Sequence, residues 1–243
     1  MATDCHQRKN REFTMRRIIS TIATVCFMTA GSMTPAAIAR DEKLDQVLGR
    51  MQESAKMLKT IKARIQQDKL HTQTGGREVY KGKLIFKRLG SKHDKVRIDY
   101  EKTDHVVALE GEKITLYQPR VNQAFITCRS ALVRDHPDFS FITALYASVG
   151  ELKATYTISY VRDDTFEGAG MSVLELVPRV TSAERKTVMW VNQQSWMPIK
   201  FEVTERNGDV TTLILRDIVK NQVIDDKQFH VSVKAGTKEH KEC

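Results

Sequence analysis

The sequence predicts a mainly β protein of the α+β class, with about eleven strands in one antiparallel meander and two helices. Short segments in which apolar and polar residues alternate recur at close spacing from residue 61 to residue 233. Turn residues such as Gly75-Gly76, Gly111-Glu112 and Asn207-Gly208 separate these segments. Parallel βαβ units would instead need a helix between successive strands.

The first 39 residues have the layout of a secretory signal peptide. Met15-Arg16-Arg17 supplies positive charge, and residues 18–31 form an uncharged, mostly apolar run. Ala37-Ile38-Ala39 then places small residues where a signal peptidase reads them. The run is short for a membrane span, which needs roughly 20 apolar residues. We therefore expect export and cleavage after Ala39, with Met15 as an alternative start. An uncleaved anchor is the competing interpretation.

An amphipathic helix follows this segment. Apolar residues repeat at intervals of three and four over residues 44–58, and charged residues occupy the other face. Asp41 and Glu42 at its start and Lys56 near its end match the helix dipole. We predict one helix of about 18 to 20 residues that begins at Asp41.

The strands follow in order after this helix, with one interruption. The alternating segments are residues 61–66, 78–88, 96–100, 105–109, 113–117, 121–128, 156–162, 171–177, 186–192, 199–204 and 210–216, with a last short strand at 229–233. Between the sixth and seventh segments, residues 138–149 predict a short helix that Gly150 ends. Phe139, Phe141 and Leu145 make that helix apolar on most sides, so it must be covered on both faces or lie over a cavity.

The apolar face of the predicted sheet has two interpretations. Its side chains can simply form a core. Alternatively, the sheet can curl into an open barrel whose mouth the helices cover, which leaves part of the interior for an apolar guest. From the residue pattern alone, both interpretations remain open.

Motifs of catalysis are absent from the sequence. It has no G-x-S-x-G elbow, H-E-x-x-H pair, P-loop or glycine-rich dinucleotide turn, and its histidines are scattered. Asp225-Asp226 predicts a turn rather than a cation site. We therefore expect no enzyme, no metal and no cofactor. The 39 basic and 30 acidic residues are interspersed, so nucleic acid is not an expected partner.

Two cysteines, Cys128 and Cys243, remain after the predicted cleavage. They could form a disulfide in an oxidising compartment, and two separate thiols are the alternative. Cys243 ends a polar, lysine-rich segment of residues 235–243, which we predict to be a tail.

Five segments share their order and spacing with a known family. They are residues 82–88 (GKLIFKR), 96–100 (VRIDY), 109–119 (LEGEKITLYQP), 137–146 (PDFSFITALY) and 189–199 (MWVNQQSWMPI), with Asn207-Gly208 after them. On these segments the chain resembles the LolA family of periplasmic lipoprotein carriers, over about residues 41–233.

This resemblance implies an incomplete antiparallel β-barrel closed by the N-terminal helix and a lid helix. It also implies a periplasmic carrier that takes lipoprotein acyl chains from the inner to the outer membrane. Such a carrier is not an enzyme. Each methylene exposed to water costs about 0.8 kcal/mol, so such cargo needs shielding. The implied partners are acylated lipoproteins, an inner-membrane lipoprotein-releasing complex and an outer-membrane acceptor. We expect a monomer with a signal peptide at 1–39, one lipid-binding half-barrel domain at 40–234 and the tail at 235–243.

The resemblance also suggests site residues. Arg88 matches the arginine that follows the glycine-led strand and that helps to hold the lid closed in the family. Leu89 stands where the family usually has proline. Our candidates for the lipid-binding cavity are Leu84, Phe86, Ile98, Tyr100, Leu109, Ile114, Leu116, Phe125, Phe139, Phe141 and Leu145. A strand register wrong by one residue would turn the strand candidates to the opposite face.

A different function on the same fold is the alternative. A lipid- or lipoprotein-sensing regulatory domain, or a general lipid-binding protein, would use the same apolar interior. Sensors of this kind usually carry a second domain, and the sequence predicts one domain, which favours the carrier.

Overall fold

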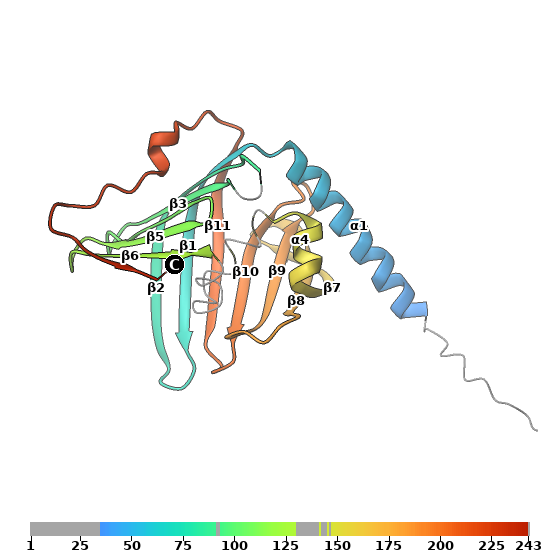
Figure 1. Ribbon diagram of the computed structural model, residues 1–243. Helices are drawn as coiled ribbons and strands as arrows, with labels where there is room; N and C mark the ends of the chain where they lie inside the picture. Colours follow the sequence, from blue (N-terminus) through green and yellow to red (C-terminus); the bar gives the residue numbers. More distant parts are fainter. Residues whose placement is uncertain (1–34, 91–92, 130–140, 142–144, 146, 243) are drawn as a thin grey trace, which may run out of the picture. The chain divides into compact units, whose positions relative to one another are not determined.

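The structure is a computed structural model of the 243-residue chain, and it describes residues 35–90, 93–129, 141, 145 and 147–242 (Figure 1). The strands are β1 (Thr60–His71), β2 (Gly76–Lys87), β3 (Lys95–Tyr100), β4 (Val106–Glu110), β5 (Lys113–Gln118), β6 (Gln123–Cys128), β7 (Tyr156–Phe166), β8 (Ala169–Pro178), β9 (Glu184–Asn192), β10 (Pro198–Glu205), β11 (Val210–Lys220) and β12 (Lys238–Lys241). The helices that are described in full are α1 (Pro35–Met57), α4 (Val149–Thr155) and the short 3₁₀ helix η2 (Asp226–Phe229).

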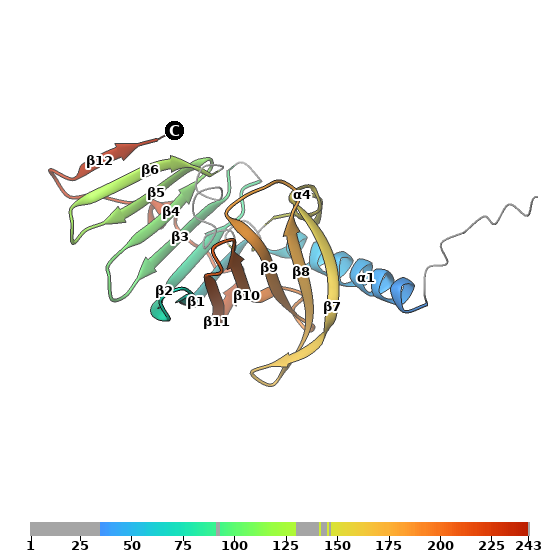
Figure 2. The same cartoon turned by 90° about the horizontal axis from the view of Figure 1, so that it is seen from below.

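The twelve described strands form one open sheet. Their order is β12-β6-β5-β4-β3-β2-β1-β11-β10-β9-β8-β7 (Figure 2). Every neighbouring pair is antiparallel except β12 and β6, which are parallel. The sheet ends at β12 and at β7 and does not close on itself, so the predicted mainly β, incomplete antiparallel barrel with helices is confirmed.

Two meanders meet in the middle of this sheet. Hairpins join β1 to β6 in sequence order, and hairpins join β7 to β11 in the same way. The two sets are connected through β1 and β11, whose pairing runs from Ile61 opposite Lys220 to Leu70 opposite Val210. The predicted Asn207-Gly208 turn lies between β10 and β11.

One face of the sheet carries the core, and we call it the inner face. It is the face of Ile61, Leu84 and Ile98, which are almost fully buried in one cluster with Val47 and Leu48 of α1. Alternation along the strands places these side chains on one side and charged side chains on the other. A second, smaller cluster, which contains Met171, Val173 and Trp190, lies on the opposite face.

Helix α1 begins earlier than predicted, at Pro35 rather than Asp41. Proline fits the first turn of a helix, because its fixed φ is already helical and its missing N–H has no partner there. Ala36 and Ala37 after it are strong helix formers. Asp41 and Glu42 therefore lie inside the helix and not in its first turn.

The prediction that Gly150 ends a helix is wrong, because Gly150 is the second residue of α4. Ser148 caps this helix: its Oγ accepts a hydrogen bond from the Glu151 N–H at 3.2 Å, and its own N–H donates to Glu151 Oε2 at 2.7 Å. This is a capping box, which starts a helix. Of the predicted lid helix, Phe141 and Leu145 are described and helical, and the remaining positions up to residue 146 lie outside the described residues.

Strand β7 is longer than predicted. Asp163 and Asp164, which we expected in a turn, are part of this strand. The turn follows at Glu167 and Gly168, whose φ angles are 51° and 79°. Two successive positive φ angles match the right-handed twist of the flanking strands, which explains the position of the turn.

The C-terminal segment also differs from the prediction. Residues 230–233 form no strand, and η2 precedes them, because the Asp225 side chain accepts a hydrogen bond from the Lys227 N–H at 2.9 Å and caps it. The expected polar tail contains a strand, β12, in which Lys238 lies opposite Gln123 and Lys241 opposite Ile126. We call residues 221–242 the C-terminal strap.

The part of the strap before β12 contacts outward-facing side chains of β3 and β5. Lys95 Nζ is 3.2 Å from Asp226 Oδ2, and Arg97 Nη1 donates to the His230 carbonyl at 2.7 Å. The Tyr117 hydroxyl accepts a hydrogen bond from the Lys234 N–H at 3.3 Å. Cys128, at the end of β6, is disulfide-bonded, and its partner is one of the three other cysteines, all of which lie outside the described residues.

Candidate functional site

The strand register places the predicted cavity residues of β2–β6 on the inner face. One row across these strands contains Leu84, Ile98, Val107, Leu116 and Phe125. The next row contains Phe86, Val96, Leu109, Ile114 and Thr127. Residues that lie opposite each other in a ladder point to the same side of the sheet.

Burial differs among these candidates. Leu84, Phe86, Ile98, Tyr100, Leu109, Ile114, Phe141 and Leu145 are buried. Leu116 and Phe125 are partly buried, and the Phe125 ring stacks on the His240 ring of the strap with centroids 4.8 Å apart. Phe139 lies outside the described residues. Contact of these residues with acyl chains stays a prediction.

The other meander supplies inner-face residues that our candidate set lacks. Met189, Val191, Phe201 and Leu213 are fully buried in the same cluster. Their alternation was visible in the sequence, but the resemblance to known carriers directed attention to the first meander. Phe201 lies beside the Phe141 ring, with centroids 6.3 Å apart, so Phe141 of the predicted lid lies against the second meander.

A narrow cleft opens onto this core where α1 ends, and we call it the α1 cleft. It is lined by Met51, Ser54, Ala55, Leu58, Arg88, Leu145, Ala147, Val149, Trp196, Met197 and Pro198. Its volume is about 20 Å³. That is room for about one water molecule, so an acyl chain can enter here only if the lining elements move apart.

A hydrogen bond joins the two walls of the α1 cleft. The Ser54 hydroxyl of α1 donates a hydrogen bond to the Ser195 carbonyl at 2.8 Å. Ser195 and Trp196 belong to the turn between β9 and β10, in which the Asn192 side chain accepts from the Ser195 N–H at 2.8 Å. Trp196 has a φ of 52°, which is uncommon for a bulky residue and costs roughly 1 kcal/mol or more.

Arg88 lies at the α1 cleft, directly after β2. Its backbone N–H donates to the Lys59 carbonyl at 2.8 Å, and its guanidinium carbon lies 5.7 Å from the centre of the Phe86 ring. Leu145 of the predicted lid lines the same cleft. The structure thus brings Arg88 and the lid segment to one place, and the role of Arg88 in lid control stays a prediction.

The turn after Arg88 is built without the proline that the family usually has. The Asp94 carboxylate accepts hydrogen bonds from the backbone N–H groups of Leu89 and Gly90, at 2.7 and 3.0 Å. Proline at position 89 has no N–H to donate. A buried carboxylate therefore fixes this turn in place of a proline ring, and Asp94 is a residue that our sequence reasoning missed.

At the far end of β1 and β11, the inner face becomes polar. Gln67, Lys69 and His71 follow Ile65 on the inner side of β1, and Tyr100 donates to Gln67 Oε1 at 2.8 Å. Lys69 Nζ lies 3.1 Å from Glu205 Oε1. We call this group the polar end, and its further members are Glu78, Tyr80, Asp209 and Thr211.

Asp209 is the best-connected carboxylate of the polar end. Burial raises its pKa, but hydrogen bonds from His71, from the Thr72 N–H and from Asn207, together with the His71 charge, outweigh burial and lower the pKa below its ordinary value. The Thr72 N–H donates to Oδ1 at 3.0 Å and Asn207 Nδ2 to Oδ2 at 3.2 Å. Asp209 is thus held as a carboxylate.

The described residues contain neither a membrane-spanning helix nor a cluster of metal ligands. Of the helices described, none combines the length and the apolar character that crossing a membrane requires. Among the same residues, no three His, Cys, Asp or Glu side chains gather as metal ligands would.

Comparison with protein families gives a match over most of the chain. The family model described as "Outer membrane lipoprotein carrier protein LolA" matches residues 56–232. The match covers most of the sheet. It includes the residues of the α1 cleft from Leu58 onward but not Met51, Ser54 and Ala55 of α1.

A curated relative and two solved structures resemble this chain at low sequence identity. An uncharacterized protein of Methanocaldococcus jannaschii is 23% identical over 208 residues, which cover 84% of this chain and 55% of that protein. The chain thus spans about half the length of this curated relative. An uncharacterized conserved protein of Thermus thermophilus superposes with a TM-score of 0.52 at 8% identity, over 82% of this chain and 99% of that one. A DUF1329 family protein of Desulfovibrio piger gives 0.50 at 11% identity, over 78% and 96%.

Proposed function

Because the chain belongs to the LolA family of outer membrane lipoprotein carrier proteins, we propose that it binds the acyl chains of lipoproteins against its inner face. We further propose that it is exported, that it acts in the periplasm, and that it carries its cargo from the inner membrane to an acceptor at the outer membrane. Its role is binding and transfer, without catalysis.

The observation that supports this proposal is a continuous apolar inner face that ends at a cleft between separable elements. Leu84, Phe86 and Ile98 lie on this face, and Met51 of α1 covers it. Apolar contacts are non-directional, so the same side chains can pack against α1 in one state and against an acyl chain in another. Each methylene that moves from water to this face contributes about 0.8 kcal/mol.

Opening would proceed at the α1 cleft. The described lining residues leave about 20 Å³ there, and the Ser54 hydroxyl joins α1 to the β9–β10 turn by one hydrogen bond. A neutral hydrogen bond contributes about 0.5–1.5 kcal/mol net, which is small beside the gain from several buried methylenes. Displacement of α1 would also expose Val47, Leu48 and Met51, so a bound acyl chain has to replace their apolar contacts as well as this hydrogen bond.

The experiment that tests this function is a release assay. The exported form of the chain is added to spheroplasts that hold newly made lipoproteins, and the soluble fraction is examined for acylated proteins bound to it. Soluble complexes would support the carrier. Bound lipid without any lipoprotein, detected by native mass spectrometry, would favour a general lipid-binding or sensing protein. If neither lipid nor lipoprotein is bound, both functions are rejected.

A variant at Phe141 adds a site-specific test. Phe141→Ser places a hydroxyl among buried apolar groups, and we expect it to weaken acyl-chain binding more than it lowers the melting temperature. Val161→Ser on the outer part of edge strand β7 is the matched control, since this valine is exposed. Equal losses of binding and stability in Phe141→Ser would make Phe141 a core residue only.

A further inference from the structure

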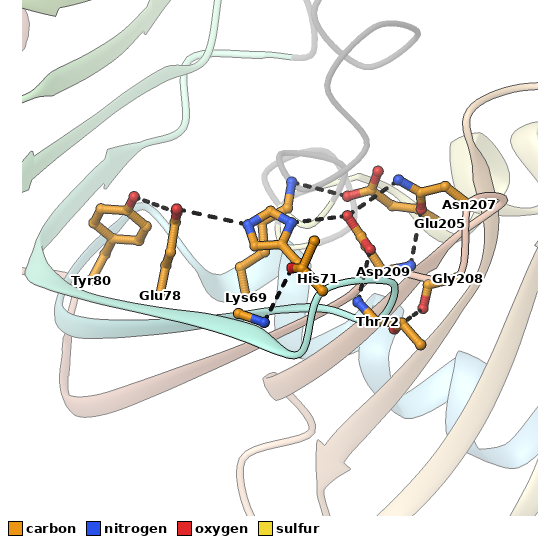
Figure 3. Close-up of polar contacts among 11 residues, drawn as sticks. Lys69, His71, Thr72, Glu78, Tyr80, Glu205, Asn207, Gly208 and Asp209 are labelled. Atoms are coloured by element: carbon orange, nitrogen blue, oxygen red, sulfur yellow. Dashed lines mark hydrogen bonds and ion pairs between the residues drawn. The ribbon is translucent and has the colours of Figure 1, made fainter.

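The polar end joins the tips of two hairpins (Figure 3). One tip connects β1 to β2 and the other connects β10 to β11. The Thr72 hydroxyl donates to the Gly208 carbonyl at 2.7 Å, and the Thr72 N–H donates to Asp209 Oδ1 at 3.0 Å. These contacts link residues 136 and 137 positions apart in the sequence.

His71 lies between two carboxylates within this junction (Figure 3). Its Nδ1 is 3.1 Å from Asp209 Oδ2, and its Nε2 is 3.7 Å from Glu78 Oε1. The other Glu78 oxygen accepts a hydrogen bond from the Tyr80 hydroxyl at 2.6 Å, which orients the carboxylate. The imidazole side chain is 34% exposed, so protons reach it from solvent.

The chemistry of imidazole makes these two contacts unequal. Neutral imidazole has one N–H and one nitrogen lone pair, whereas the protonated ring has two N–H groups. The shorter contact assigns the N–H of the neutral ring to Nδ1, facing Asp209. In that form, the Nε2 lone pair faces the negative Glu78 carboxylate, and this second contact becomes attractive only when Nε2 carries a proton.

We propose that His71 is a proton-operated clasp: protonation of Nε2 engages Glu78 and thereby ties β2, across β1, to the tip of the β10–β11 hairpin. In the neutral state the clasp engages Asp209 alone. The inference concerns the polar end of the sheet and does not depend on the proposed lipid cargo.

The other charged groups that face this junction include carboxylates that can interact with a protonated His71. Lys69 of β1 pairs with Glu205 of β10 at 3.1 Å, and the remaining carboxylates, Glu78 and Asp209, both face His71. Asn207 and Tyr80 complete the described surroundings as neutral donors. Protonated His71 therefore meets two carboxylates, Glu78 and Asp209.

The lowered pKa of Asp209 is consistent with this arrangement. His71 is among the groups that lower it, together with the Thr72 N–H and Asn207, although burial acts in the opposite direction. Asp209 is therefore a carboxylate between about pH 5 and about pH 8, the range in which histidine side chains in general change charge.

The test is amide hydrogen exchange of the full chain at about pH 5 and about pH 8, corrected for the intrinsic pH dependence of exchange. We expect the amides of the β1–β2 and β10–β11 tips to be protected about two- to fivefold more at the lower pH, as a half-exposed ion pair allows. Glu78→Gln should abolish this difference while the Asp209 contact remains. His71→Gln should abolish it as well.

His93→Gln is the matched control, since His93 is exposed and lies at the other end of β2. It should keep the full pH dependence. Protection of the tips that is independent of pH in the native chain would overturn the clasp, and so would a pH dependence that survives Glu78→Gln. If His71→Gln does not fold, the native chain and Glu78→Gln alone decide the question.

Discussion

The two ends of the inner face are built from opposite kinds of contact. At the α1 end, Phe86, Ile98 and Val47 pack in an apolar cluster, and one hydrogen bond from Ser54 joins α1 to the β9–β10 turn. At the polar end, Thr72 and Asp209 take part in a network of directional hydrogen bonds and ion pairs. The same strands, β1 and β2, contribute to both ends.

Because of this difference, the α1 end can exchange its contacts, whereas the polar end keeps them. An apolar surface loses little when one apolar neighbour replaces another, because its contacts have no direction. When a buried carboxylate separates from its donors, each buried polar group that is left without a hydrogen bond costs its desolvation free energy. We infer that the α1 cleft opens while the hairpin tips stay joined.

The largest effect on stability is expected at the α1 end. Phe86→Ala removes a fully buried ring from the main cluster and should lower the free energy of unfolding by about 3–5 kcal/mol, measured by denaturant titration. Val161→Ala, at an exposed position, should change it by less than about 0.5 kcal/mol. A loss below about 1 kcal/mol for Phe86→Ala would show that this end is not held by packing.

The disulfide of Cys128, at the end of β6, is a third type of contact besides packing and hydrogen bonds. Cys128→Ser should lower the free energy of unfolding by about 2–4 kcal/mol, because it removes the disulfide. The parallel register ends with Lys241 opposite Ile126, and two positions further on in each segment are Cys243 and Cys128. We therefore predict Cys243 as the partner.

Mass spectrometry under non-reducing conditions identifies the partner directly. Cys243→Ser should then match Cys128→Ser in unfolding experiments, and reductant should lower the stability of the native chain but not of either variant. A Cys243→Ser variant that retains a disulfide at Cys128 would contradict the pairing.

A smaller effect, with a pH signature, is expected at the polar end. Asp209→Asn keeps the size of the side chain but removes the charge that His71 and Thr72 bind. The lowered pKa of Asp209 means that the folded state favours the carboxylate, so its contribution is present above the ordinary value of about 3.8 and disappears as the pH falls through the lowered pKa. The variant should lose that acid-dependent part.

Unfolding curves at neutral pH and at a pH below the lowered pKa of Asp209 measure this difference. The native chain should be more stable than Asp209→Asn at neutral pH, and the two should converge in acid. Curves that stay parallel at both pH values would mean that the carboxylate charge does not hold the hairpin tips together.

The smallest effect on stability, with an effect on transfer, is expected for Arg88→Leu. Arg88 lines the α1 cleft, and its loss should leave the chain folded while it alters lipoprotein release in the spheroplast assay. Arg88→Lys, which keeps the charge but not the planar guanidinium, is the control. Normal loading and release in Arg88→Leu would remove this residue from lid control.

Much of the sheet could be predicted from the sequence, because alternation is a local signal. Phe201 and Val203 of β10 lie on the inner face, as their spacing indicates. Ile199 in the same segment packs in the outer cluster with Trp190, because the register shifts between Pro198 and Lys200. An irregularity of this kind depends on the neighbouring strand and leaves no trace in the spacing.

The elements that were missed depend on contacts between distant parts of the chain. Asp209 and Thr72 meet only because β1 pairs with β11, and β12 exists only because the edge of β6 is available to it. The start of α4 is different, since Ser148 and Glu151 have the spacing of a capping box. That signal was present in the sequence and was overlooked in favour of Gly150.

The pairing of β1 with β11 has a consequence for how the molecule assembles. Within each meander, neighbours in the sheet are neighbours in sequence, so these hairpins close short loops and form fast. The seam between the meanders brings Ile61 to Lys220, and this pairing must close the longest loop of the sheet. A chain whose C-terminal third is still missing has no partner for one side of β1, so the native sheet can form only when synthesis is nearly complete.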